Sequence, residues 1–257
     1  MKIILLAFIL SFNIVNAQEQ KATKLEYIST NFLDYNFEGI DNVYIFENYQ
    51  KSLTIVEDKI DLRKKKLKED EIITIKLETS EREYYFQDKE KQMLFFRDIV
   101  IQDIFYVSEK LPIFTWLLIN EFKEIENKKL QKATTNFRGR TYTAWCDLDT
   151  PIDQGPWKFN NLPGLAYNII DETPNFYFEW HLRKVNEVPL SEVPFTNPEQ
   201  KKYLDIKEFV SERAKVYKEF EEKSRARTSI PGLEEVSSES HYIDRRIRSN
   251  EIKYEWE

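Results

Sequence analysis

Between residues 22 and 188 the hydrophobic and polar side chains follow a dominant period of two. The segments 73–78 and 176–183 alternate strictly, which is the pattern of a strand with one buried face. Similar short apolar runs occur at Val43–Phe46, Leu53–Val56, Tyr84–Phe86, Met93–Phe96, Ile113–Ile119 and Thr141–Cys146. Residues 99–106 fit a strand or a helix equally well. The separators are short and polar, and short connections join antiparallel strands. The pattern predicts a mainly β fold, a curved antiparallel sheet (a meander or half-barrel) with one apolar face.

The period changes beyond residue 189. Asn197 is a good helix-capping residue, and Pro198 follows it at the position where helices favour proline. Apolar residues then recur along one stripe, at Ile206, Val210, Tyr217 and Phe220. We expect a helix over residues 197–227 that covers the sheet, because a sheet with an apolar face needs a covering layer.

The two ends of the chain differ from the part between them. Lys2, the apolar run 3–10 and the small residue Ala17 form the pattern of a secretory signal, with cleavage expected after Ala17. Residues 228–257 are rich in Ser, Glu and Arg and have few apolar anchors, which predicts a mobile tail that folding does not need. We therefore expect a signal peptide at 1–17, a single domain over 18–227 and a periplasmic or secreted location.

Composition excludes several classes of function. The 257 residues carry a net charge of −7, which argues against a nucleic-acid partner, because such binding depends on neutralising phosphates. One cysteine and two histidines exclude an intramolecular disulfide framework and a multi-thiolate zinc site. Beyond the signal no apolar stretch is long enough for a transmembrane segment. We expect no metal and no cofactor.

Three of the five glycines, Gly139, Gly155 and Gly164, lie close together in the chain. They belong to two sequence words, FRGRTYTAW at residues 137–145 and GPWKFNNLPGLA at residues 155–166. These words resemble the GLPGLI family of secreted bacterial proteins, and the likeness covers residues 120–185 most closely. Asn161 stands where the family motif has Gly, and Ala166 where it has Ile. The family has no established reaction, so the resemblance implies export but no activity.

The segment 155–164 has two interpretations. Pro156 and Pro163 prevent it from being a central strand, and the order Pro163-Gly164 is typical of a type II turn with Gly164 at positive φ. It is either a rigid plug that closes one end of the sheet or a binding surface held on a rigid scaffold. The candidate ligand-binding residues are Arg138, Arg140, Trp145, Trp157, Lys158, Leu162, Pro163 and Gly164. We expect Trp157, Leu162 and Leu165 to pack, and Arg140 and Lys158 to line an open edge.

Candidate chemistry is sparse. Arg138 and Arg140 are two residues apart, so on a strand both would point to one face, where they could bind an anion or pair with neighbouring acids. Asp147, Asp149 and Asp153 lack the spacing of a calcium loop and are expected to be turn acids. Glu179 and His181 would share the polar face of a strand.

Two functions remain open. The first is non-catalytic binding of a small apolar or amphipathic ligand, a peptide or an envelope protein. The alternative is a hydrolase that uses Arg140 as an anion clamp with a nearby carboxylate base, and a carboxylate buried beside Arg140 would favour it. No catalytic residue can be assigned, because the chain has no G-x-S-x-G, H-E-x-x-H or phosphate-binding glycine motif.

Overall fold

The computed structural model describes residues 20–31, 37–57, 60–61, 82–173, 178–228 and 250–257. The expected signal peptide and the strand expected at 73–78 lie outside these residues. The strands are β1 (Lys21–Asn31), β2 (Phe37–Phe46), β3 (Lys51–Val56), β4 (Ile60–Asp61), β5 (Tyr84–Asp88), β6 (Met93–Val100), β7 (Asp103–Lys110), β8 (Leu117–Ile125), β9 (Lys128–Phe137), β10 (Arg140–Asp147), β11 (Leu165–Asp171), β12 (Phe178–Pro189) and β13 (Leu204–Asp205). The helices are the short 3-10 helix Leu190–Glu192 and α1 (Ile206–Thr228).

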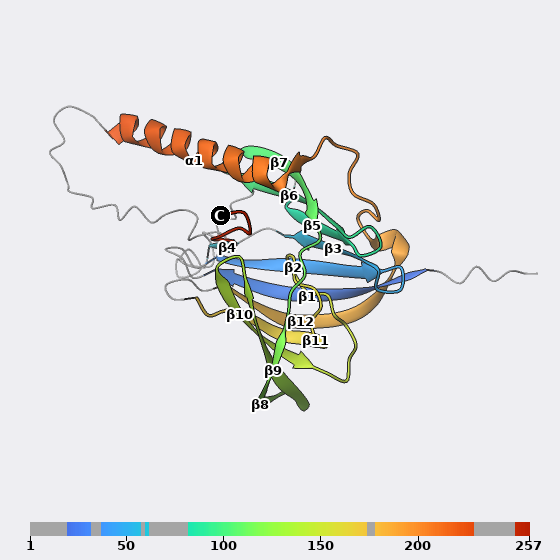
Figure 1. The fold of residues 1–257 in the computed structure, drawn as a ribbon. Coiled ribbons are helices and arrows are strands. Elements are labelled where there is room, and N and C mark those ends of the chain that lie inside the picture. The colour runs from blue at the N-terminus through green and yellow to red at the C-terminus, as the bar shows by residue number, and fades with distance from the viewer. Residues whose placement is uncertain (1–19, 32–36, 58–59, 62–81, 174–177, 229–249) are drawn as a thin grey trace, which may run out of the picture.

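All of these strands belong to one curved, open sheet, which confirms the predicted fold class (Figure 1). Its order is β13-β7-β6-β5-β3-β2-β1-β12-β11-β10-β9-β8, with β4 beside β2. Every pairing is antiparallel except that of β13 with β7. The sheet is therefore two meanders, β1 to β7 and β8 to β12, joined where β1 pairs with β12.

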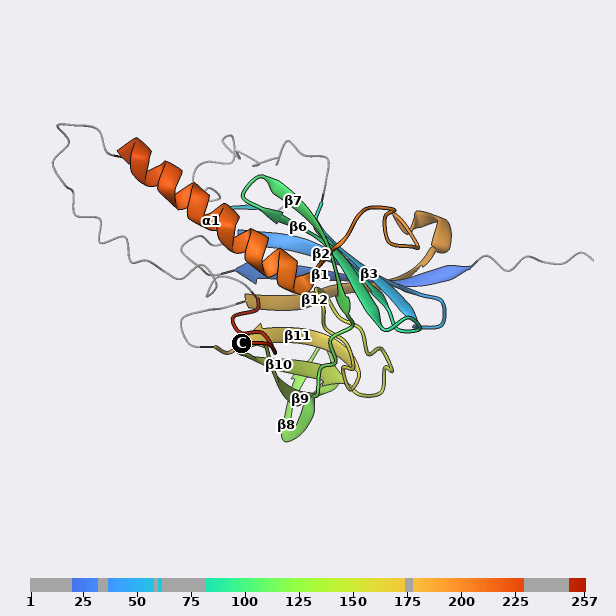
Figure 2. The same ribbon diagram turned by 45° about the horizontal axis from the view of Figure 1, so that its top comes forward.

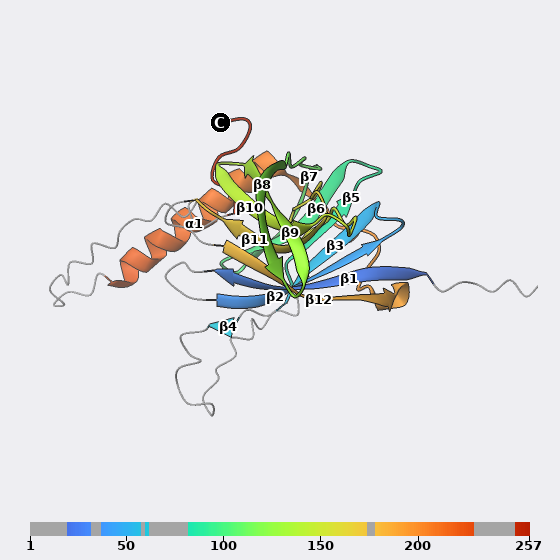
Figure 3. The same cartoon turned by 90° about the horizontal axis from the view of Figure 1, so that it is seen from below.

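A short connection forces the sheet to curl. Strands β7 and β8 are consecutive in the chain, yet ten strand spacings separate them in the sheet, which would be about 48 Å if the sheet were flat. Residues 111–116 join them, and a chain of that length spans at most about 25 Å. The two halves of the sheet must therefore bend toward each other, as Figure 3 shows.

The ambiguous run 99–106 is a β-hairpin. Strand β6 ends at Val100, and β7 begins at Asp103. Ile101 lies between them at φ 62, a left-handed conformation that tightens the turn. Strand β8 begins only at Leu117, so the first part of the predicted strand Ile113–Ile119 belongs to the connection between the two halves.

The expectation of a single apolar face is wrong for the middle of the sheet. Val43 and Ile45 belong to the core on the concave side, whereas Tyr44 and Phe46 belong to a second core on the other face. Phe195, from the segment that follows β12, covers this second face; it packs edge-to-face on Tyr84 and stacks on Phe86. Strands β2 and β5 read as continuous apolar runs because both of their faces are buried.

Helix α1 covers the edge of the concave side near β6 and β7, as Figures 1 and 2 show. The predicted start at residue 197 is wrong: the helix begins at Ile206. Asp205 accepts a 2.8 Å hydrogen bond from the backbone N–H of Lys207, and Glu208 accepts one from the backbone N–H of Asp205. This reciprocal capping box is stronger than a cap by Asn197 with proline beyond it.

The helix packs through only part of its predicted stripe. Ile206 is buried in the core, and Val210 and Tyr217 pack against it partly buried, whereas Phe220 is 40% exposed. Phe209, which is outside the predicted stripe, is buried edge-to-face on Phe96 and Phe105. Within the described residues, no helix has the length and hydrophobicity needed to cross a membrane.

The end of the chain returns to the sheet. The backbone N–H groups of Ile252 and Lys253 donate to the carbonyl of Arg138 at 2.8 and 3.0 Å, and Glu251 and Tyr254 are buried. The expectation of a mobile tail therefore does not hold for residues 250–257, while residues 229–249 lie outside the described chain. The error arose because the anchoring residues come after a long polar stretch.

Candidate functional site

The loop between β10 and β11, residues 148–164, is the plug loop of this structure. Asp147 organises its start: its carboxylate accepts hydrogen bonds from the backbone N–H of Asp149 and the hydroxyl of Thr150 at 3.0 and 2.9 Å. Lys128 pairs with the same carboxylate at 3.2 Å, and Asp153 pairs with Lys89 at 2.7 Å. Asp147 and Asp153 thus act as structural loop acids.

Gly164 ends the loop at a point where its backbone passes close to the backbone of Asp147. Its role does not depend on a left-handed conformation. A Cβ atom added there would lie 2.2 Å from the carbonyl oxygen of Asp147. The φ of Gly164 is not positive, which overturns the predicted type II turn, whereas Asn161 does have a positive φ of 53°. Asn tolerates this conformation better than most residues, so Asn161 fits a position that would otherwise favour glycine.

The middle of the plug loop enters the concave side of the sheet. The backbone N–H of Gly155 donates to the carbonyl of Phe159 at 3.0 Å, and the N–H of Phe159 donates to Pro156 at 3.2 Å. Trp157 lies within this turn at φ 55, a costly conformation for a bulky residue that its surroundings must enforce. Phe159 is completely buried among the rings of Phe114, Trp116, Tyr142, Trp157 and Trp180.

Asn160 fastens the plug loop to the connection between the two halves of the sheet. Its side-chain amide donates to the carbonyl of Pro112 at 2.7 Å, and its backbone carbonyl accepts from the indole of Trp116 at 3.0 Å. The plug is therefore a central part of the core, not a corner of the sheet. Leu162 and Leu165 are buried as expected, at 3% and 4% exposure.

Lys158 does not line an open edge as expected; its side chain is only 1% exposed. Its ammonium group contacts Glu109 of β7 at 2.6 Å and Glu251 of the C-terminal segment at 2.9 Å, and it lies 4.3 Å from the ring centre of Phe96. Arg138 pairs with the same two carboxylates and with Glu255. This buried charge cluster joins β7, the β9–β10 turn, the plug loop and the chain end.

Arg138 and Arg140 do not form the predicted pair on one strand face. Arg138 lies in the turn between β9 and β10 at φ 44, next to Gly139 at φ 83, so the alternation of a strand does not apply. Arg140 instead contacts Asp171 of β11 at 2.7 Å, and neither side chain has any exposed surface. The guanidinium groups of Arg138 and Arg140 therefore pair with different carboxylates.

The remaining candidate residues, Trp145 and Pro163, lie outside the buried charge cluster. Trp145 is half-buried, with Lys123 4.5 Å from its ring centre, and Pro163 is half-buried before Gly164.

Glu179 and His181 share a polar face and contact each other at 2.5 Å. Burial raises the pKa of the Cys146 thiol to about 12, which makes it unreactive. Within the described residues no group of acids, His and Cys is arranged to hold a metal.

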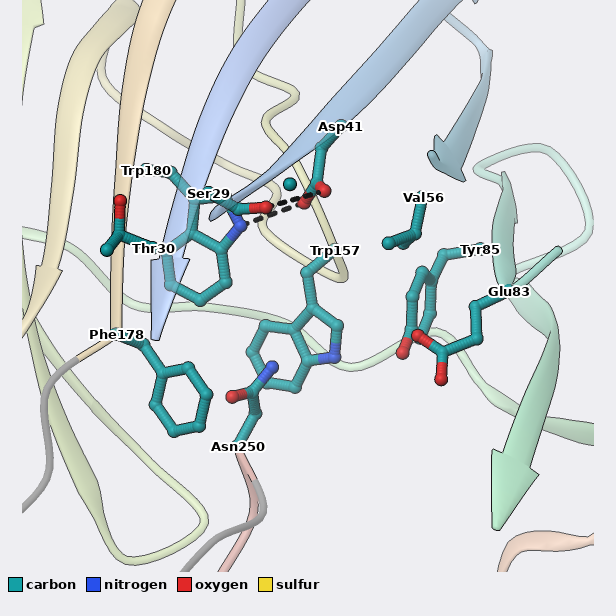
Figure 4. Close-up of a pocket in the computed structure, with 11 residues that line it drawn as sticks. Ser29, Thr30, Asp41, Val56, Glu83, Tyr85, Trp157, Phe178, Trp180 and Asn250 are labelled. Carbon is teal, nitrogen blue, oxygen red and sulfur yellow. Dashed lines mark hydrogen bonds between the residues drawn. The ribbon is translucent and has the colours of Figure 1, made fainter. Parts of the chain in front are cut away.

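A pocket of about 80 Å³ opens beside Trp157 on the concave side (Figure 4). Its described lining consists of Ser29, Thr30, Gly39, Asp41, Val56, Glu83, Tyr85, Trp157, Phe178, Trp180 and Asn250. Four of these residues are aromatic, and Trp157, from the plug loop, lies between Asp41 and Asn250 in the close-up. Trp157 is the one member of the predicted set among the described lining residues.

Asp41 is the central polar residue of this pocket. It is 3% exposed and accepts a 3.0 Å hydrogen bond from the hydroxyl of Ser29 and a 2.9 Å hydrogen bond from the indole N–H of Trp180. Donors of this kind favour the ionised carboxylate. The pocket wall therefore contains a carboxylate that two hydrogen-bond donors hold in place.

The lining also contains an amide oxygen and a phenol hydroxyl. The side-chain oxygen of Asn250 is buried and has no hydrogen-bond partner among the described residues. Burial raises the pKa of the Tyr85 hydroxyl, and the negative charges of Glu83, Asp98, Glu251 and Asp41 raise it further. No Lys, Arg or His occurs in the described part of the lining, so the pocket is electronegative.

Sequence analysis missed most of this pocket. A signal existed at Asp41, which lies two residues before Val43 and four before Ile45, so it shares their inward face. An acid at such a position is unusual enough to mark a site. Asn250 had no signal, because only the tertiary structure brings the chain end to Trp157.

The fold and the pocket define a class of protein: an open, curved antiparallel sheet with a plug loop and a small aromatic, electronegative pocket.

A scan against protein-family models and a search of curated proteins both found no match. Two solved structures of PNGF-II, in different crystal forms, are similar in shape, with 14% identity and TM-scores of 0.47 and 0.48. They cover 76% and 77% of this chain, which spans about a third of theirs (33% and 34%). A likeness this distant says nothing about activity.

Proposed function

We propose that this protein is a non-catalytic binding protein whose pocket beside Trp157 receives one small group of its ligand. The ligand is a peptide, a partner protein or a small amphipathic molecule, of which one side chain or chain end enters. The observation that carries the proposal is an open pocket with four aromatic residues and a hydrogen-bonded acid, the composition typical of ligand sites. At about 80 Å³ the pocket is smaller than the roughly 150 Å³ cavity that holds benzene.

The geometry gives less support to the hydrolase alternative. Asp171 is a carboxylate buried beside Arg140, which is the arrangement that would favour chemistry. Both side chains are completely buried against each other, however, and neither is among the lining residues of the pocket. A substrate anion could reach Arg140 only after the core had opened, so we favour binding.

The location and family are part of the same proposal. The signal pattern at residues 1–17 and the resemblance to the GLPGLI family support an exported envelope protein. Intact-mass measurement of the exported protein is expected to give an N-terminus at Gln18. A soluble cytoplasmic product that keeps residues 1–17 would contradict export.

A titration tests binding directly. The indole N–H signals of Trp157 and Trp180 in nitrogen-15 spectra report on the pocket, and the probes are propan-1-ol, propylammonium and propionate. With four or five non-hydrogen atoms, each probe is expected to bind with a Kd of roughly millimolar at best. We expect at least one probe to shift both signals saturably.

A matched pair of variants makes the test specific. Val56→Phe places a ring in the pocket and is expected to abolish the shifts, whereas Val185→Phe, at a 44% exposed position outside the lining, is expected to retain them. The proposed function fails if none of the three probes shifts the signals, or if Val56→Phe retains them.

A further inference from the structure

We propose that the pocket beside Trp157 selects an alkylammonium group, such as the end of a lysine side chain or of a small aliphatic amine. This inference rests on the proposed function and names the chemical class of its ligand. The described pocket wall combines carboxylates, aromatic rings and an acceptor without a partner, and lacks basic residues. Each of these features favours a cation that donates hydrogen bonds.

The charge of the wall excludes an anionic ligand. Asp41 and Glu83 both line the pocket, and their charges add to the effect of burial in raising the pKa of the Tyr85 hydroxyl. Among the described residues beside the pocket, Arg82 pairs with Glu57, and Lys158 pairs with Glu109 and Glu251. The carboxylates of Asp41 and Glu83 would therefore repel an incoming carboxylate or phosphate and attract an ammonium group.

The aromatic residues suit the same cation. Trp157, Trp180, Phe178 and Tyr85 line the pocket, and aromatic faces attract ammonium groups within about 6 Å of the ring centre. The chain already uses this contact nearby, where Lys158 lies 4.3 Å from the ring centre of Phe96. The rings also pack against the methylene groups that carry a primary amine.

The number of acceptors distinguishes an ammonium group from a neutral alcohol. An alkylammonium group has three N–H donors, whereas an alcohol has one. The buried side-chain oxygen of Asn250 has no partner among the described residues, and a buried acceptor of this kind costs free energy until it receives a donor. Asn250 and Asp41 both line this pocket, and Trp157 appears between them in the view of Figure 4.

The three probes, which are similar in size but differ in charge, decide between these classes. We expect propylammonium to bind roughly tenfold more tightly than propan-1-ol, because its hydrogen bonds are charge-assisted, and propionate to give no saturable shift. Equal binding of propylammonium and propan-1-ol, or tighter binding of propionate, would overturn the ammonium proposal while leaving the proposed function standing. Failure of all three probes would overturn both.

A charge-neutral variant tests the mechanism. Glu83→Gln is expected to weaken propylammonium binding about three- to tenfold and to leave propan-1-ol binding unchanged within about twofold. Glu187→Gln, at an exposed acid outside the described lining, is the matched control and should change neither. An equal loss for both probes in Glu83→Gln would contradict a role for its charge.

The source of the amine is tested with one further probe. Nα-acetyl-lysine methylamide presents the same alkylammonium group on a peptide backbone. Tighter binding of this probe than of propylammonium assigns the site to a lysine of a peptide or partner protein. Weaker binding assigns it to a free aliphatic amine, and no binding of either would overturn the proposal.

Discussion

The indole N–H of Trp180 donates a 2.9 Å hydrogen bond to the carboxylate of Asp41, although strand β1 separates the two strands that carry them. Ser29 of β1 donates to the same carboxylate. The three residues therefore connect adjacent strands on the concave side and hold a charge beside Trp157. This contact joins the two meanders of the sheet exactly where the pocket forms.

The first prediction concerns this hydrogen bond. Trp180→Phe keeps an aromatic ring but removes the donor, so Asp41 stays buried with one partner fewer. We expect a loss of about 1–3 kcal/mol in the free energy of unfolding, measured by urea denaturation. Trp145→Phe, at a half-buried position on β10, is the control and should cost less than about 1 kcal/mol. Equal losses would show that ring volume, and not the hydrogen bond, decides stability.

The second prediction concerns the buried pair of Arg140 and Asp171. Burial lowers the pKa of Arg140 and raises the pKa of Asp171, so desolvation outweighs the attraction between them. Arg140→Ala leaves the carboxylate of Asp171 without this partner and is expected to cost about 3–5 kcal/mol. The double variant Arg140→Met with Asp171→Leu is expected to lie within about 1 kcal/mol of the parent protein. A double variant as unstable as Arg140→Ala would contradict this account.

The third prediction concerns the pH dependence of the buried charge cluster. Burial alone would raise the pKa of Glu251, but the charges of Lys158 and Arg138 hold it below its ordinary value. Because the folded pKa is depressed, the contribution of Glu251 is present above the unfolded value, about 4.3, and is lost as the pH falls through the folded one.

A neutral variant measures this contribution. Glu251→Gln is expected to cost about 2 kcal/mol at pH 7, and the difference from the parent protein should shrink as the pH falls below about 4. Glu255→Gln changes an exposed partner of Arg138 and should cost less than about 1 kcal/mol. A difference that stays constant from pH 7 to pH 3 would rule out this linkage.

The fourth prediction reverses the sequence-based expectation that the tail is dispensable. Removal of residues 250–257 takes away Glu251 and the buried Tyr254, and it exposes Lys158 and Arg138. We expect the melting temperature to fall by about 5 °C or more, since each 1 kcal/mol lost shifts it by roughly 2–4 °C in a domain of this size. An unchanged melting temperature would show that the C-terminal contacts add no stability.

The fifth prediction concerns Gly164. Gly164→Ala adds a Cβ atom that would lie 2.2 Å from the carbonyl oxygen of Asp147, so the backbone of the plug loop must shift. We expect a loss of about 1–3 kcal/mol in urea denaturation. Pro163→Ala changes the preceding, half-buried residue and should cost less. Full stability of Gly164→Ala would mean that the loop end can move freely.

The sequence by itself determined the fold class and the importance of the plug loop. Alternation of apolar residues with short polar separators specifies antiparallel strands, because side chains alternate between faces with a period of two. Clustered glycine and proline around Trp157 marked a fixed backbone, and the buried turn at Gly155 to Phe159 confirms it. These features are local, so they can be read without knowing the rest of the structure.

Only the tertiary structure decided which charges are buried and where the pocket lies. Lys158 and Arg138 meet Glu109 and Glu251 from distant parts of the chain, and no periodicity encodes such a meeting. The start of α1 at Ile206 was missed because the capping box of Asp205 and Glu208 competes with an equally plausible cap at Asn197. The pocket combines β1, β2, β3, β5, β12, the plug loop and the chain end, which come together only when the sheet curls.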